Sequence, residues 1–113
     1  MRQQESKMTK TNINLIVNGT KAYTRKTTGR PYTHALVAQC GGKWTITSCS
    51  SKGPAALQRT VEEVEKNRVY LVGRIAAEPT HDWIEGWRRT LARIEATEYR
   101  IVPIIDNTVT VNA

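Results

Sequence analysis

Two histidines and two cysteines are the side chains of this sequence that best fit metal binding or nucleophilic chemistry. They are His34, Cys40, Cys49 and His81, and their spacing lacks the close Cys or His pairs of zinc motifs. A hairpin turn predicted over residues 41–42 would place Cys40 about 20 Å from Cys49, at about 3.3 Å per residue. That distance exceeds the limit of about 7 Å between disulfide Cα atoms. We therefore expect no metal, no cofactor and no structural disulfide.

The same predicted register places His34 opposite Cys49, a combination that can act as a general base and a thiolate. No orienting carboxylate or oxyanion site can be assigned to this pair, so packing or surface roles are the simpler interpretation. His81 is followed by Asp82 and Glu85, but acidic residues are typical of a first helical turn because they complement the helix dipole. The sequence therefore predicts that the protein is not an enzyme.

A basic face on the first predicted hairpin is the stronger candidate site. Strict strand alternation places Lys21, Tyr23 and Arg25 on the side of the sheet that carries Asn12 and Asn14. Such a set can contact phosphates through its charges and stack a base on its ring. The face is extended by three further cations: Lys26, Arg30 and Lys43. The alternative is an ordinary solvated hairpin, because its alternation of polar residues has the same pattern.

A second basic stripe is predicted on the last long helix, where Arg88, Arg89 and Arg93 lie close together in the sequence. Glutamates are interleaved with these arginines, which is also typical of a solvated helix face with ion pairs. Trp83 lies off the apolar stripe of the same helix, so it can anchor a protein partner or pack at the rim of the core.

Residues 52–54, which are Lys, Gly and Pro, precede the first predicted helix. Free N–H groups at a helix start, next to Lys52, can bind one phosphate. This is a generic anion site. The two glycines of residues 41–42 lie between predicted strands instead, so they indicate a turn and no phosphate loop.

Two β-hairpins are predicted in the first half of the chain. Ile13, Leu15 and Val17 alternate before Asn18 and Gly19, a dipeptide typical of a two-residue hairpin turn. That turn predicts three facing pairs: Val17 with Thr20, Leu15 with Ala22, and Ile13 with Thr24. The second hairpin joins residues 32–39 to 43–48, with two predicted pairs: Val37 with Ile46, and Gln39 with Trp44.

Two helices and further strands are predicted in the second half. Pro54 fits the first turn of a helix that ends near Asn67. Residues 69–75 are rich in β-branched side chains and predict a strand. Thr80 fits an N-cap for an amphipathic helix that continues to about residue 97. Strand composition returns over residues 99–105, with Pro103 favouring an edge position, and residues 106–113 either add a short strand or fray.

These elements predict a small α+β protein in the order β-β-β-β-α-β-α-β. An antiparallel sheet from the two N-terminal hairpins and the later strands would be covered by two helices. The length of 113 residues suits one compact domain. We assign residues 1–10 to a flexible basic arm and residues 11–113 to this single α+β domain.

The charge is distributed unevenly along the chain. The formal net charge is +7, and the sequence pI is about 9.8. Residues 1–59 contain ten Lys and Arg against one acidic residue, whereas residues 60–113 contain seven against nine. A basic half beside a nearly neutral half favours a polyanionic partner for the first half.

The sequence also indicates where the protein acts. No apolar run reaches the length of about 18 residues that a membrane helix needs. The first residues are not followed by the continuous apolar segment of a signal peptide. We therefore expect a cytoplasmic protein that does not bind membranes.

Three functional hypotheses follow. The first is a non-enzymatic protein that binds nucleic acid or a nucleic-acid-handling complex through the basic hairpin face. The second is an inhibitor or adaptor that docks on an acidic or RNA-binding protein surface, for example on a host defence nucleoprotein such as a CRISPR effector. Small size, basic charge and the lack of an enzyme motif resemble those of many phage and plasmid regulators. The third and weakest is a small hydrolase or transferase using Cys49 or His81.

Overall fold

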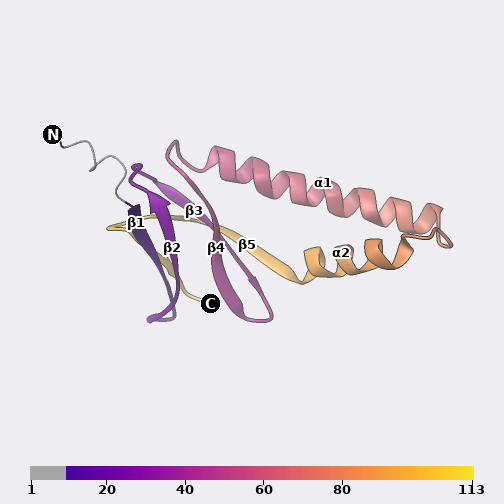
Figure 1. The fold of residues 1–113 in the computed structure, drawn as a ribbon, viewed down its shortest axis with the longest axis horizontal. Helices are drawn as coiled ribbons and strands as arrows, with labels where there is room; N and C mark the ends of the chain where they lie inside the picture. Colours follow the sequence, from indigo (N-terminus) through magenta and orange to yellow (C-terminus); the bar gives the residue numbers. More distant parts are fainter. Residues whose placement is uncertain (1–9) are drawn as a thin grey trace.

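The computed structural model describes residues 10–113, and the predicted arm of residues 1–10 falls outside this range except for Lys10. Two three-stranded sheets lie together at one end of an elongated molecule, and a pair of antiparallel helices extends from them (Figure 1). The principal extents are 62 × 34 × 22 Å. The fold is α+β, as predicted, but the strands form two sheets and not the single antiparallel sheet that was expected.

The first sheet has the strand order β2-β1-β6. It contains β1 (Lys10–Val17), β2 (Thr20–Thr28) and β6 (Thr108–Val111). Asn18 and Gly19 form the predicted turn between β1 and β2, and both have positive φ, 51° and 85°. The last strand, β6, pairs with β1 in parallel, so the chain returns to the N-terminal hairpin after both helices.

The register of the first hairpin differs from strict alternation. Val17 faces Thr20 as predicted, but an irregularity at Leu15/Ile16 shifts the pairs beyond it by one residue on β2. Leu15 therefore faces Tyr23 and not Ala22. Because side chains alternate along a strand, a shift of one residue turns every later β2 side chain to the opposite face.

The second sheet has the order β4-β3-β5. It contains β3 (His34–Cys40), β4 (Lys43–Ser50) and β5 (Thr97–Pro103). The pairs Val37 with Ile46 and Gln39 with Trp44 are confirmed. A second bulge at Leu36/Val37 shifts the remaining pairs, so His34 faces Ser50 instead of Cys49. Pro103 ends the edge strand β5, where the missing N–H is tolerated.

The inner faces of the two sheets form the hydrophobic core. β1 contributes Ile13 and Leu15, which are 1% and 0% exposed. The opposing sheet contributes Val37 and Ile46, and the C-terminal β6 adds Val109. Burial of these apolar side chains is the main force that holds the sheets together.

The helices are α1 (Ala55–Ala77) and α2 (Ile84–Ala96). The predicted strand over residues 69–75 is wrong, because α1 continues through it without a break. A short apolar run does not distinguish a strand from a helix, and Leu71 continues the series of inward-facing residues of α1. The end predicted near Asn67 is therefore also wrong, and the observed order is β-β-β-β-α-α-β-β.

The two helices pack against each other and project away from the sheets (Figure 1). They therefore cover less of the sheets than predicted. α1 contacts β4 and β5, and Leu57 in its first turn is 2% exposed. Below, residues 55–96 are called the helical hairpin, and residues 10–54 with 97–113 are called the β body.

Candidate nucleic-acid interface

The bulge in β2 removes two residues from the predicted basic face. Tyr23 packs against the hydrophobic core. Arg25 is half-buried, and its Nη1 donates a hydrogen bond to the main-chain carbonyl of Ile46, 3.3 Å away on the other sheet. Lys21, Tyr23 and Arg25 therefore do not project together, and the prediction that they form one face is wrong.

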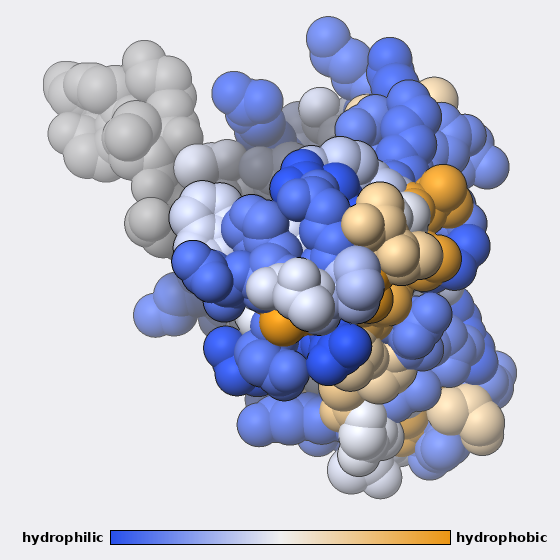
Figure 2. Space-filling view, turned by 90° about the vertical axis from the view of Figure 1, so that its right-hand side faces the viewer, coloured by the Kyte–Doolittle hydropathy of each residue, from blue (hydrophilic) through white to orange (hydrophobic). Residues whose placement is uncertain are grey.

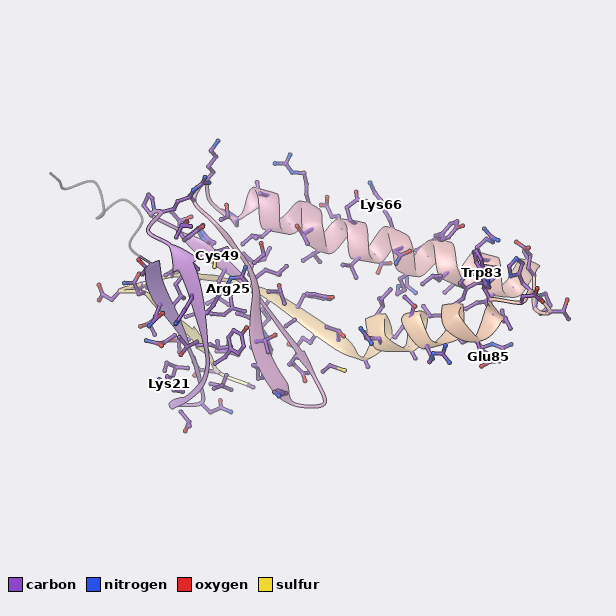
Figure 3. All side chains as sticks on the ribbon, viewed as in Figure 1. Lys21, Arg25, Cys49, Lys66, Trp83 and Glu85 are labelled. Carbon is purple, nitrogen blue, oxygen red and sulfur yellow. The ribbon has the colours of Figure 1, made fainter. Side chains whose placement is uncertain are left out.

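The other predicted cations of the β body are exposed but dispersed. Lys21 and Lys43 follow the two hairpin turns, and Figure 3 shows Lys21 at that end of the first hairpin. Lys26 lies on the outer face of β2, where its partner across the ladder is Asn12. Arg30 belongs to the loop between β2 and β3, at the opposite ends of the strands from Lys21.

Among the cations predicted on the basic hairpin face, Arg30 lines a pocket at the junction of the β body and α1. The pocket has a volume of about 330 Å³ and lies where the β2–β3 loop, the end of β4 and the start of α1 meet. We call it the basic pocket and define it by the following lining residues: Arg30, Tyr32, Ser50, Ser51, Lys52 and Thr60. Both cations are exposed, and neither forms an ion pair within residues 10–113.

Main-chain and side-chain hydrogen bonds hold the loops around the basic pocket. Thr33 donates from its main-chain N–H to the carbonyl of Ser50 at 2.7 Å. The hydroxyl oxygen of Ser50 accepts a bond from the N–H of Lys52 at 3.2 Å. The Thr33 hydroxyl oxygen accepts another from the N–H of Gly53 at 3.0 Å. These bonds connect the segment that carries Lys52 to the strand β3.

The first turn of α1 adds donors beside the pocket. Its N-cap is Pro54, which makes no side-chain cap bond, and the first turn contains no acidic residue. The first N–H groups of an α-helix have no partner within the helix and carry a partial positive charge. The N–H groups at the start of α1 thus add to the positive potential that Arg30 and Lys52 create.

Tyr32 places an aromatic ring in the same pocket. Its hydroxyl lies 3.2 Å from the Thr28 hydroxyl, and its ring packs partly against the core. Serine and threonine hydroxyls complete the lining. Guanidinium, ammonium and hydroxyl groups are the usual partners of phosphate oxygens, and a tyrosine ring can stack on a base.

Cys49 also lines this pocket but is poorly suited to act as a nucleophile. Burial raises the pKa of its thiol above the usual value, while the nearby Arg25 partly opposes this shift. The two residues lie close together in Figure 3. His34 is paired with Ser50 and donates to or accepts from the Thr33 hydroxyl at 2.9 Å. The predicted pairing of His34 with Cys49 is therefore wrong.

The stripe of Arg88, Arg89 and Arg93 lies on α2, in the part of the molecule that projects from the β body. Arg88 forms an ion pair with Glu85 at 3.2 Å. Arg89 and Arg93 line a shallow pocket of about 310 Å³ on α2 itself. These arginines therefore do not belong to the basic pocket.

The charges of the two parts differ strongly. The β body contains eight Lys and Arg against two Asp and Glu, whereas the helical hairpin contains seven of each. On the helical hairpin, all four ion pairs join residues three or four apart, such as Arg68 with Glu65 at 2.6 Å. The excess positive charge is thus a property of the β body.

The structure brings together residues that sequence spacing could not connect. The sequence indicated a generic anion site at residues 52–54, but Arg30, Tyr32 and Thr60 come from three other positions in the chain. Within residues 10–113, no three His, Cys, Asp or Glu side chains form a cluster that could hold a metal. In the same range, neither helix has the length and hydropathy to cross a membrane.

Comparisons with known proteins add no relative. No family model, no curated protein sequence and no solved structure matches this chain.

Proposed function

We propose that this chain is a non-enzymatic binding protein that engages nucleic acid, or a complex that handles nucleic acid, in the cytoplasm. The observation that carries the proposal is the basic pocket, where Arg30 and Lys52 converge from different loops beside the start of α1. Arg30 was predicted as a binding residue, whereas Tyr23 and Arg25 are replaced by Lys52 and Tyr32.

The chemistry of the pocket fits a phosphodiester backbone. Arg30 and Lys52 can each neutralise one phosphate group. The free N–H groups at the start of α1 can donate hydrogen bonds to a phosphate oxygen beside them. Tyr32 offers a ring to a neighbouring base. The contacts are mostly to phosphate, so we expect weak dependence on base sequence and strong dependence on salt.

Binding can be measured by fluorescence anisotropy with labelled strands of about 20 nucleotides, as single-stranded DNA, duplex DNA and RNA. The test protein carries Arg30→Glu with Lys52→Glu. Its matched control carries Lys21→Glu with Lys43→Glu, which changes the net charge equally but at the other end of the β body. We expect a loss of about 30-fold or more for the first protein, from two lost phosphate contacts, and a much smaller loss for the control. Equal losses would show that net charge alone controls binding and would overturn the assignment to the pocket.

A second candidate function, an inhibitor or adaptor that docks on another protein, is favoured by one observation. Trp83 lies at the turn between the helices and is 70% exposed. Exposed tryptophans are enriched among residues that dominate protein interfaces. Affinity capture from the native host after nuclease treatment tests this role: one saturable partner lost with Trp83→Ala supports it, and a partner retained by that variant contradicts it.

A further inference from the structure

The helical hairpin leaves much of its apolar surface uncovered. Within the described chain, α2 has no fully buried residue, and α1 has only Leu57 and Leu71. Val69 and Val72 are 56% and 44% exposed. Figure 2, which views the hairpin end of the molecule, shows hydrophobic residues in a band down one side between hydrophilic ones. Two helices alone cannot enclose a core, so this surface is suited to a further layer.

One side of the helical hairpin forms a groove near its base. A pocket of about 430 Å³ lies between α1 and α2 and is lined by Val61, Glu65, Ile94 and Glu95, among others. Residues four and seven positions apart share one side of a helix. On α1, Val69 and Val72 therefore lie on the same face as Glu65. On α2, Leu91 and Arg88 lie on the same face as Glu95. We call this surface the groove face and define it by these residues: Val61, Glu65, Val69, Val72, Arg88, Leu91 and Glu95.

The charge of the groove face indicates which partner can cover it. The helical hairpin has seven positive and seven negative residues, in a protein whose net charge is +7. The groove face itself carries Glu65, Glu95 and Arg88, and Arg68 lines the same pocket, so it has no excess positive charge and attracts a polyanion weakly. It is also the one extended part of the described chain where a second copy can approach without repulsion between excess positive charges.

The positions of individual charges favour an antiparallel arrangement. Glu95 lies at the base of the hairpin, and Arg88 lies two helical turns further out on the same side of α2. A two-fold axis across the hairpin would bring Glu95 of one copy towards Arg88 of the other, twice. The same axis places the two basic β bodies at opposite ends, whereas a parallel arrangement would bring them together.

We propose that the groove face binds the same face of a second copy of this chain and forms an antiparallel four-helix bundle. This inference does not depend on nucleic-acid binding. The 13 residues of α2 span about 20 Å, and two adjacent helices are about 20 Å wide. This footprint of about 400 Å² per copy, or about 800 Å² in total, is smaller than the roughly 1,200 Å² that stable specific interfaces bury, so the dimer is expected to be weak. The dimer is therefore expected to dissociate on dilution.

Sedimentation equilibrium of the full chain, freed of nucleic acid by nuclease and high salt, tests the proposal. Between about 1 and 500 µM protein, we expect the mass to rise from that of one copy, 12.7 kDa, towards twice that value. A mass that stays at one copy over the whole range overturns the proposal.

Substitutions locate the interface. Val72→Glu places a charge on the groove face at an exposed position, so we expect a single copy at all concentrations and an unchanged circular dichroism spectrum. Ile105→Glu is the matched control, because Ile105 is 67% exposed and lies on the loop before β6. We expect this control to dimerise as the parent does. Dimerisation by Val72→Glu, or its loss in Ile105→Glu alone, contradicts the groove face.

Charge exchange tests the orientation without altering the apolar surface. Glu95→Arg and Arg88→Glu are each expected to weaken the dimer at least threefold, and the double variant is expected to regain most of the affinity. If the double variant is weaker than both single variants, the antiparallel arrangement is wrong. These exposed positions also keep the test valid should Val72→Glu fail to fold.

Discussion

Arg25 reaches from one sheet to the other: its Nη1 donates a hydrogen bond to the main-chain carbonyl of Ile46 at 3.3 Å. Arg25 lies on β2 and Ile46 on β4, so this bond connects the two layers around the core. The guanidinium also lies near the thiol of Cys49, whose pKa it lowers against the larger effect of burial. Arg25 is thus a structural cation, and its charge is directed away from any ligand on the outer face.

Replacing Arg25 by Met tests this role. The variant keeps most of the apolar stem but loses the bond to Ile46, so the free energy of unfolding is expected to fall by about 1 kcal/mol. The control is Lys26→Met, which also removes one positive charge but from the neighbouring residue, whose side chain is exposed. Urea denaturation of both proteins provides the measurement, and equal stabilities for the two variants would contradict the role of Arg25 between the sheets.

The two cysteines are expected to react at different rates. Cys40 is exposed, whereas Cys49 is half-buried and burial raises the pKa of its thiol. Because the thiolate is the reactive form, Cys49 is expected to react with iodoacetamide at least tenfold more slowly at mildly alkaline pH. Mass spectrometry of the digested protein distinguishes the two sites. Equal rates would mean that the interior near Arg25 opens readily.

Glu98 is expected to make stability depend on pH. Hydrogen bonds from Arg100 and Gln39 lower the pKa of the Glu98 carboxyl below its usual value of 4.5. The ionised Glu98 carboxylate therefore adds to the free energy of unfolding at pH values above the pKa of Glu98 in the unfolded chain. This added stability is lost as the pH falls through the lower pKa of Glu98 in the folded protein. Glu98→Gln is therefore expected to be slightly less stable than the parent at neutral pH and equally stable in strong acid. Thermal unfolding across this range checks the prediction, and a difference that grows on acidification would refute it.

Turn chemistry made the hairpins predictable, but the bulges were not predictable. The Asn18 and Gly19 turn and the turn at residues 41–42 are confirmed because these residues adopt positive φ. A bulge adds one residue to a strand without a distinctive side chain, so Ala22 gave no warning of the shift that turns Arg25 inward. One inserted residue thus changed the candidate site more than it changed the fold.

The second half of the chain shows where local composition is ambiguous. The amphipathic pattern of α2 was recognised, but the β-branched run of residues 69–75 predicted a strand where α1 continues. No proline interrupts this run, and packing against α2 overrides a weak strand preference. The basic pocket was not predictable as a whole, because Arg30, Tyr32 and Thr60 meet only through the arrangement of β2, β3 and α1.

The salt dependence of nucleic-acid binding tests the central claim most directly. The affinity of the parent protein and of the Arg30→Glu, Lys52→Glu double variant is measured at several salt concentrations. Each lost phosphate contact lowers the slope of log affinity against log salt by about 0.7 to 0.9, so the slope is expected to become shallower by about 1.4 to 1.8. The Lys21→Glu, Lys43→Glu control is expected to keep nearly the parent slope. A parent affinity that does not change with salt, or a double variant with the parent slope, would contradict nucleic-acid binding by the basic pocket.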